Sequence, residues 1–284
     1  MDGLSCATVL YAARRVNRDP SGRIVPIMGM LAAFVFAAQM LNFPVLGGTS
    51  GHLAGGALLG ILLGPMAGLI TMATVVIAQA LILQDGGLAA LGANIFNMGA
   101  VASFSGYAAF RLLGGDRPGG RRLAISSFLA GWLSMMLSAA CCSLELAFSG
   151  AIPLRVGLPA MAGYHAVIGI FEGGLTAGIM AFISQARPDL VKGELNSGLK
   201  FRDSVAAIVF VALPISILAL AGSSGLPDPL QRLLVAGRDS GHPEGVLVAP
   251  GRYADYLTRI GASAALLSIV YVAYRLARRW TDSR

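Results

Sequence analysis

The order of hydrophobic and polar positions divides the chain into long apolar runs separated by short polar connections. No Asp, Glu, Lys or Arg occurs between Ile24 and Gln84, a stretch of 61 residues. At about 20 residues for each membrane crossing, this stretch is long enough for about three passes. It is interrupted at Pro44–His52, which contains three glycines, and at Gly64-Pro65. Proline and glycine interrupt helices, so we expect helix ends at both places.

Further apolar runs follow, and a short amphiphilic segment precedes them all. The nine expected segments cover residues 4–16, 24–43, 53–64, 66–83, 93–113, 123–148, 157–185, 204–222 and 258–277. The third segment is too short to span a membrane alone. The polar stretch 186–202 separates the first seven segments from the last two, which flank an outer loop at 223–257. The pattern predicts an all-α polytopic membrane protein, with a seven-segment helical bundle in residues 1–200 and two transmembrane helices in residues 201–284.

The composition excludes a soluble enzyme. Hydrophobic residues make up 56% of the chain and charged residues 12%, with a mean hydropathy of +0.72, whereas soluble domains carry about 25% charged residues. The 37 glycines and the 7% aromatic content favour closely packed helices over an outer-membrane barrel with aromatic girdles. The first residues lack the basic region of a signal peptide, so we expect none.

The basic residues predict the orientation, because cytoplasmic loops are enriched in Lys and Arg. With the N-terminus outside, sixteen of the 21 basic residues lie on the inner side. Five lie on the outer side: Arg155, Arg232, Arg238, Arg252 and Arg259. The sequence therefore predicts a multi-pass protein of the cell (inner) membrane with its C-terminus in the cytoplasm. The net charge of +7 reflects this orientation, and nucleic-acid binding is not indicated.

His52 is the first candidate for metal binding. The run Gly47-Gly48-Thr49-Ser50-Gly51-His52 places non-helical backbone and an imidazole at membrane depth. Irregular backbone there is tolerated only where it is buried in protein or lines a wet cavity. Imidazole is a ligand for Ni²⁺, Co²⁺, Cu²⁺ and Zn²⁺, but a histidine that caps the following helix explains the position equally well.

A second group of polar residues lies on the predicted segments 123–148 and 157–185. His165 and Glu172 are seven residues apart and share one helix face, and Glu145 lies near the outer end of the preceding helix. Ionisable groups in a bilayer usually face the interior of a bundle, so this pair is either a metal site or a polar clamp between helices. Four uncharged residues flank the outer loops and are secondary candidates for lining the same cavity: Asn42, Gln84, Asn94 and Asn97.

Three motifs occur in a characteristic order: GGTSGH at 47–52, DGGLAALGAN at 85–94 and RPDL at 187–190. With the apolar runs around them, over about residues 20–190, they resemble the CbiM/NikM family. These proteins are the substrate-capturing membrane subunits of energy-coupling-factor importers for cobalt and nickel. The part after the polar stretch resembles the small companion subunit of these importers. Its Pro227-Asp228-Pro229-Leu230-Gln231 is a degenerate form of the companion's Pro-Asp-Gly-Leu-Glu signature.

The resemblance implies a metal site built at the N-terminus. Family members begin Met-His-Ile-Pro-Asp-Gly, and the terminal amine, the second backbone nitrogen and its imidazole join the histidine of the GGTSGH loop. His52 matches that histidine, whereas Met1 and Asp2 stand where the family has Met and His. Either the native start lies upstream of Met1, which we favour, or this protein binds metal with an altered set of ligands.

The resemblance also implies the function and the partners. We expect a permease component that binds Ni²⁺ or Co²⁺ as transported substrate, with no resident cofactor and no catalysis. The chain has no G-x-x-x-x-G-K-[ST] motif, so ATP hydrolysis would come from cytoplasmic ATPase subunits acting through a transmembrane scaffold subunit. The alternatives are an intramembrane metalloenzyme using His52, His165 and Glu172, and an ATP-independent secondary carrier. Both metals accept imidazole and amine nitrogens, so the residues do not distinguish nickel from cobalt.

Overall fold

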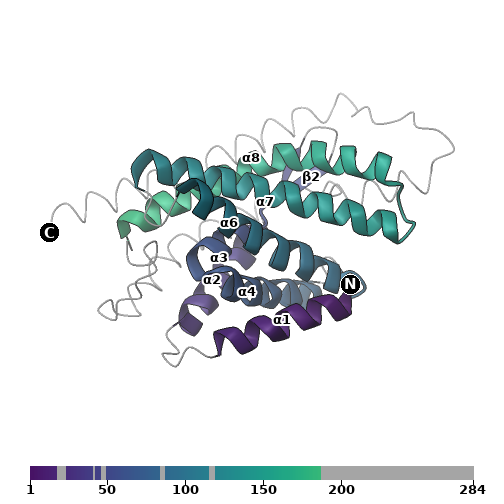
Figure 1. Ribbon diagram of the computed structural model, residues 1–284, viewed down its shortest axis with the longest axis horizontal. Helices are drawn as coiled ribbons and strands as arrows, with labels where there is room; N and C mark the ends of the chain where they lie inside the picture. Colours follow the sequence, from purple (N-terminus) through teal and green to yellow (C-terminus); the bar gives the residue numbers. More distant parts are fainter. Residues whose placement is uncertain (18–23, 41, 46–48, 84–86, 115–118, 187–284) are drawn as a thin grey trace.

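The computed structural model describes residues 1–17, 24–40, 42–45, 49–83, 87–114 and 119–186. The predicted two-helix region 201–284 and its outer loop lie outside these residues. The described part is a bundle of helices with one small β-hairpin (Figure 1). Its elements, in chain order, are α1 (Asp2–Val16), α2 (Ile24–Gln39), β1 (Asn42–Val45), β2 (Thr49–His52), α3 (Gly56–Leu63), α4 (Pro65–Ala78), the π-helix η1 (Gln79–Leu83), α5 (Leu91–Asn94), the π-helix η2 (Ile95–Val101), α6 (Ala102–Gly114), α7 (Gly120–Phe148) and α8 (Leu154–Ala186).

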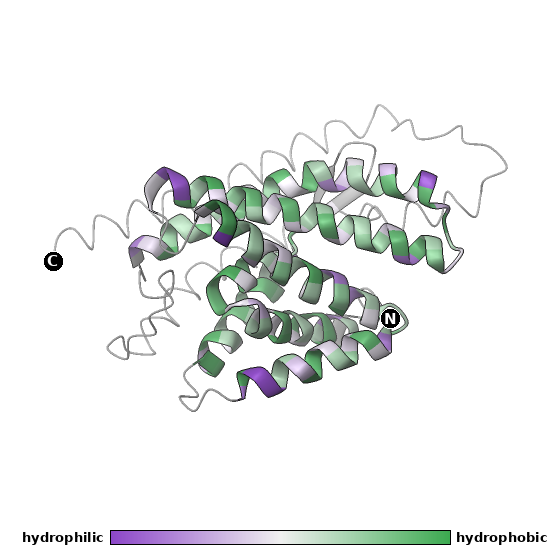
Figure 2. Cartoon of the chain, viewed as in Figure 1, coloured by the Kyte–Doolittle hydropathy of each residue, from purple (hydrophilic) through white to green (hydrophobic). Residues whose placement is uncertain are grey.

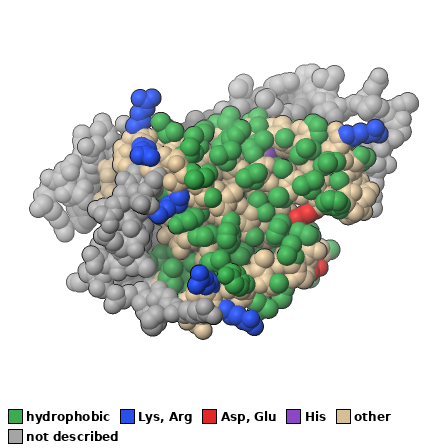
Figure 3. Space-filling model, in the orientation of Figure 1, with side chains coloured by type: hydrophobic (Ala, Val, Ile, Leu, Met, Phe, Trp, Pro, Cys, Tyr) green, Lys and Arg blue, Asp and Glu red, His purple; other side chains and the backbone are tan. Residues whose placement is uncertain are grey.

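The predicted helices are confirmed in the described part. Helices α7 and α8 coincide with the segments expected at 123–148 and 157–185 and are long and apolar enough to cross a membrane. The shorter apolar helices α2 and Pro65–Leu81 pack against each other. Apolar residues dominate these helices, and the most hydrophilic positions lie towards their ends (Figure 2). Hydrophobic side chains also cover most of the visible face, with basic side chains at its margins (Figure 3).

The hairpin corrects the all-α prediction. The segment expected to be helical over 24–43 ends at Gln39, and β1 pairs antiparallel with β2, with Asn42 opposite His52. A hairpin satisfies backbone groups across its two strands, which non-helical backbone at membrane depth requires. Pro44 has no N–H to donate and is tolerated because each strand of a two-stranded sheet is an edge strand.

The short helix α3 lies at the centre of the bundle. It has eight residues, about 12 Å at 1.5 Å per residue, so it is too short to span a membrane, as predicted. Its first five residues are all buried, and it packs against α4, α6, α7 and α8. Gly64, at φ +80°, ends α3, and Pro65 begins α4. The core of the described region is therefore built around the helix that follows the hairpin.

Glycines permit the close approach of these helices. A Cβ atom on Gly60 of α3 would collide with the backbone carbonyl of Ser103 on α6. One turn earlier, the Ser103 hydroxyl donates a hydrogen bond to the Gly56 carbonyl (3.2 Å). In the long hairpin of α7 and α8, a Cβ on Gly131 would lie 2.9 Å from Cα of Gly173. The high glycine content therefore serves backbone-to-backbone packing, as small residues do between membrane helices.

Gly60→Ala tests this packing. The added methyl group meets backbone atoms that cannot rotate away, so we expect a loss of about 1–3 kcal/mol from overpacking. The matched control is Gly178→Ala on α8, where a Cβ meets nothing within 4 Å and loss of glycine flexibility stabilises by about 0.5–1 kcal/mol. Thermal unfolding in detergent should show a lower midpoint for Gly60→Ala alone. Equal midpoints for the two variants would contradict the packing described here.

Candidate functional site

His52 is the last residue of β2 and leads into the turn that begins α3. The turn ends at Gly55, whose φ of +74° favours glycine. A Cβ there would also lie 2.9 Å from a methyl group of Val35 on α2. The imidazole is half-buried. The sequence thus places a histidine at a sharp change of direction between a hairpin and the central helix.

The ring of His52 is oriented by its own backbone. Nδ1 lies 3.1 Å from the carbonyl oxygen of Leu53. A carbonyl oxygen can only accept a hydrogen bond, so Nδ1 carries the proton and the neutral ring holds its lone pair on Nε2. Metal-binding histidines use the same arrangement, in which one nitrogen donates to a fixed acceptor and the other binds the metal. In this tautomer Nε2 is the ring nitrogen that has a lone pair for a ligand.

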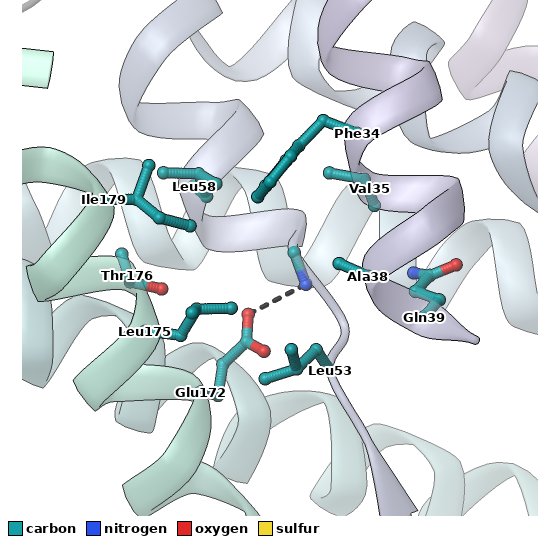
Figure 4. A pocket seen from close by; sticks show the side chains of 11 residues that line it. Phe34, Val35, Ala38, Gln39, Leu53, Leu58, Glu172, Leu175, Thr176 and Ile179 are labelled. Carbon is teal, nitrogen blue, oxygen red and sulfur yellow. Dashed lines mark hydrogen bonds between the residues drawn. The ribbon is translucent and has the colours of Figure 1, made fainter. Parts of the chain in front are cut away.

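The turn after His52 is held from two sides (Figure 4). The Glu172 carboxylate on α8 accepts hydrogen bonds from the backbone N–H groups of Ala54 (2.9 Å) and Gly55 (2.8 Å). From α2, the Gln39 side-chain amide donates to the Ala54 carbonyl oxygen (2.6 Å). Glu172 is 2% exposed and Gln39 is 3% exposed, and both line one pocket, whose other walls are mainly apolar. Two buried side chains from distant parts of the chain thus meet on one peptide unit.

His165 has a different environment from the one expected of a partner to Glu172. Its Nδ1 lies 2.8 Å from the carbonyl oxygen of Met161, one turn earlier on α8. Both oxygens of Glu172 accept hydrogen bonds from the turn after His52. The structure therefore brings Glu172 to the His52 turn, and its carboxylate joins α8 to α3. Among the described residues, no three His, Cys, Asp or Glu side chains are grouped so as to hold a metal ion.

The N-terminus packs on the short helix α5. Asp2 begins α1 and lies directly against Gly92, and the Ser5 hydroxyl donates to the Gly92 carbonyl (2.6 Å). Asn94, the last residue of α5, is half-buried. The first residues, Met1 and Asp2, are exposed. These contacts place the N-terminal amine, the second element of the expected metal site, beside α5.

A buried amide and a carboxylate lie near this amine. Asn97, on η2 and 7% exposed, donates from Nδ2 to Oε2 of Glu145 (3.0 Å). The π-helix η2, which carries Asn97, packs against α1. Within the described part, Oδ1 of Asn97 and Oε1 of Glu145 are buried without a hydrogen-bond partner. Two of the polar residues singled out in the sequence are thus in direct contact beside the N-terminus.

Gln39 is the residue that sequence reasoning missed. It stands in the apolar run Ala-Ala-Phe-Val-Phe-Ala-Ala-Gln-Met, and a lone amide in such a run is a signal of a buried hydrogen bond. Its partner is backbone, and no sequence motif indicates which backbone group lies opposite. The secondary candidates Asn42 and Gln84 lie where the structure does not describe side chains.

Comparison with known proteins supplies the family. The CbiM profile, described as the cobalt uptake substrate-specific transmembrane region, matches residues 2–190. A putative fused nickel transport protein NikMN of Archaeoglobus fulgidus is 39% identical over 230 residues, covering 80% of this chain and 75% of that protein. A cobalt transport protein CbiM of Sorangium cellulosum is 35% identical over 185 residues, covering 63% of this chain and 80% of that protein.

A solved structure shares the fold. It is the crystal structure of a truncated transition metal transporter, with a TM-score of 0.59 and 31% sequence identity, covering 65% of this chain and 92% of that one. The 230 residues matched to the fused NikMN protein cannot fit within residues 2–190, so the region after the polar stretch fits the fused arrangement. The chain therefore belongs to the CbiM family and is a membrane component of cobalt and nickel transport.

Proposed function

We propose that this protein captures Ni²⁺ or Co²⁺ at the outer face of the cell membrane for ATP-driven uptake. The single observation that carries the proposal is the hydrogen bond from His52 Nδ1 to the Leu53 carbonyl oxygen, which leaves Nε2 for a metal. Imidazole nitrogen is a good ligand for both ions. The remaining nitrogens would come from the N-terminus, whose docking on α5 is supported by Asp2 and Ser5.

The mechanism proposed is ligand exchange. A hydrated ion arrives from outside, loses water and is held by His52 with N-terminal nitrogens, and a rearrangement driven from the cytoplasmic side then weakens the set. Energy would come from separate ATPase subunits coupled through a transmembrane scaffold subunit. The names of the relatives, a fused nickel transport protein and a cobalt transport protein, support the choice of the transported ion. In this mechanism the chain would contribute substrate binding.

The proposed orientation places the N-terminus outside and the C-terminus in the cytoplasm. Arg121 and Arg122 lie in the first turn of α7, and Arg122 donates to the Leu113 carbonyl at the end of α6 (3.1 Å). Arg155 lies at the start of α8, beyond the opposite end of α7. This distribution supports an inner side at the α6–α7 connection, because basic residues collect in the cytoplasm.

His52→Ala is expected to abolish high-affinity metal binding while leaving the protein folded, because it removes one nitrogen ligand at a half-buried surface position. We expect at least a tenfold weaker affinity, about 1.4 kcal/mol, in calorimetric titration with Ni²⁺ and Co²⁺ in detergent. His165→Ala and His242→Ala are the matched controls and should bind as the wild type does. If His165→Ala loses binding and His52→Ala does not, the metal site lies on α8 instead.

The N-terminus offers an independent test. Aspartate supplies an oxygen where the family has imidazole, and oxygen is a poorer ligand than nitrogen for Ni²⁺ in a nitrogen-rich site. Replacing residues 1–3 by Met-His-Ile-Pro-Asp-Gly should strengthen Ni²⁺ binding at least about tenfold at neutral pH. The comparison is made by calorimetry on the two full-length proteins. Equal affinities would show that the N-terminal geometry of the family does not apply to this chain.

Single cysteines at the two ends of α7 test the orientation. In a background without Cys6, Cys141 and Cys142, Ser149→Cys should react with an impermeant thiol reagent applied to intact cells, and Gly119→Cys should react only after the membrane is opened. Ser149 is exposed beyond the end of α7, and a Cβ on Gly119 meets nothing within 4 Å. The reverse labelling pattern would refute the proposed topology.

A further inference from the structure

The turn between His52 and α3 has an unusual set of partners. Three of its backbone groups are bonded to side chains that are distant in sequence: the Ala54 and Gly55 N–H groups to Glu172, and the Ala54 carbonyl to Gln39. The residues joined by the Glu172 bonds are 118 and 117 positions apart. The first N–H groups of a helix lack partners within the helix, so Glu172 occupies the place of an N-terminal cap supplied by another helix.

The chemistry of both residues fits this role. An ionised carboxylate has two oxygens and only accepts hydrogen bonds, so it can satisfy two converging N–H groups at once. A side-chain amide both donates and accepts, and Gln39 uses its N–H on the Ala54 carbonyl that faces away from Glu172. The peptide unit between Ala54 and Gly55 is thereby held at its nitrogen, the Gly55 N–H, by Glu172 of α8 and at its oxygen by Gln39 of α2. Rotation of this unit would break contacts on both sides.

The orientation of His52 depends on the neighbouring peptide unit, between Leu53 and Ala54, whose N–H group donates to Glu172. His52 is two residues before Ala54, and its ring is held by the Leu53 carbonyl, which belongs to the peptide bond that contains the Ala54 nitrogen. A shift of the Ala54 nitrogen therefore moves the acceptor that orients Nδ1 and changes the direction of the Nε2 lone pair.

We propose that Glu172 and Gln39 are positioning residues of the metal site, clamping the Leu53–Gly55 turn so that His52 presents Nε2 to the ion, and that Glu172 does not itself bind the metal. The inference rests on the proposed capture of Ni²⁺ or Co²⁺ by His52. It also assigns different tasks to His165 and Glu172, since His165 bonds to its own helix and Glu172 bonds to the turn.

The first test measures, without metal, how firmly Glu172 and Gln39 hold the Leu53–Gly55 turn. Glu172→Gln retains size but replaces one acceptor oxygen by a donor, and Gln39→Met retains size but donates nothing. Hydrogen–deuterium exchange of the peptide covering residues 53–58 should speed up in both variants. Thr176→Val is the matched control, because Thr176 is equally buried, lies one turn from Glu172 and lines the same pocket. Unchanged exchange in both Glu172→Gln and Gln39→Met would overturn the clamp.

The second test measures the effect of the same substitutions on metal binding. Titration of the full chain with Ni²⁺ should show at least about tenfold weaker binding in Glu172→Gln, and weaker binding in Gln39→Met, with no change in Thr176→Val. In the His52→Ala background, Glu172→Gln should have no further effect. At saturating Co²⁺ the visible absorption bands of Glu172→Gln should match those of the wild type, because a positioning residue contributes no ligand atom.

The outcomes separate this inference from the function on which it rests. Altered Co²⁺ bands in Glu172→Gln at saturation would make Glu172 a ligand and overturn the positioning role. Weaker binding in His52→Ala with wild-type binding in both clamp variants would retain the proposed function and overturn the clamp's effect on the metal. A wild type that binds neither ion, or a His52→Ala variant that binds as tightly as the wild type, would overturn the proposed function itself. If Glu172→Gln does not fold, Gln39→Met keeps both measurements decisive.

Discussion

The structure depends on one constraint: backbone that leaves a helix inside a membrane must find hydrogen-bond partners within the protein. Two devices meet it here. The hairpin of β1 and β2 pairs its own backbone groups, and the turn that follows takes partners from Glu172 and Gln39. The central helix α3 then begins at a fixed position in the core. The surrounding helices thus hold the hairpin and its turn in place. The helix that follows them, α3, lies at the centre of the bundle.

The same contacts connect the proposed site to the helices that surround it. Glu172 lies on α8, Gln39 ends α2, and His52 ends β2. Hydrogen bonds link these elements, so in the proposed arrangement a relative movement of α2 and α8 would change the direction of the His52 ring. A change at one end of the bundle can in this way alter the affinity for an ion, which import with release on the opposite side requires.

The contact between η2 and α7 presents a second polar arrangement. Asn97 belongs to the π-helix η2, and its backbone carbonyl accepts a hydrogen bond from Ser138 on α7 (2.9 Å). Its side chain bonds to Glu145. π-helical turns leave backbone groups outside the regular helical pattern and are frequent at functional sites. In this protein the turn brings a buried amide and a carboxylate into direct contact beside α1.

Hydrophobic patterning alone predicted the helices that the structure describes, the shortness of α3 and the non-helical backbone at His52. These are local properties, since apolar length and glycine or proline breaks act within a few residues. Only the tertiary structure decided that residues 42–45 form a strand and that Glu172 binds the turn after His52. The reason is that a buried carboxylate takes whatever donors the fold places beside it, and those of Ala54 and Gly55 lie more than a hundred residues away along the chain.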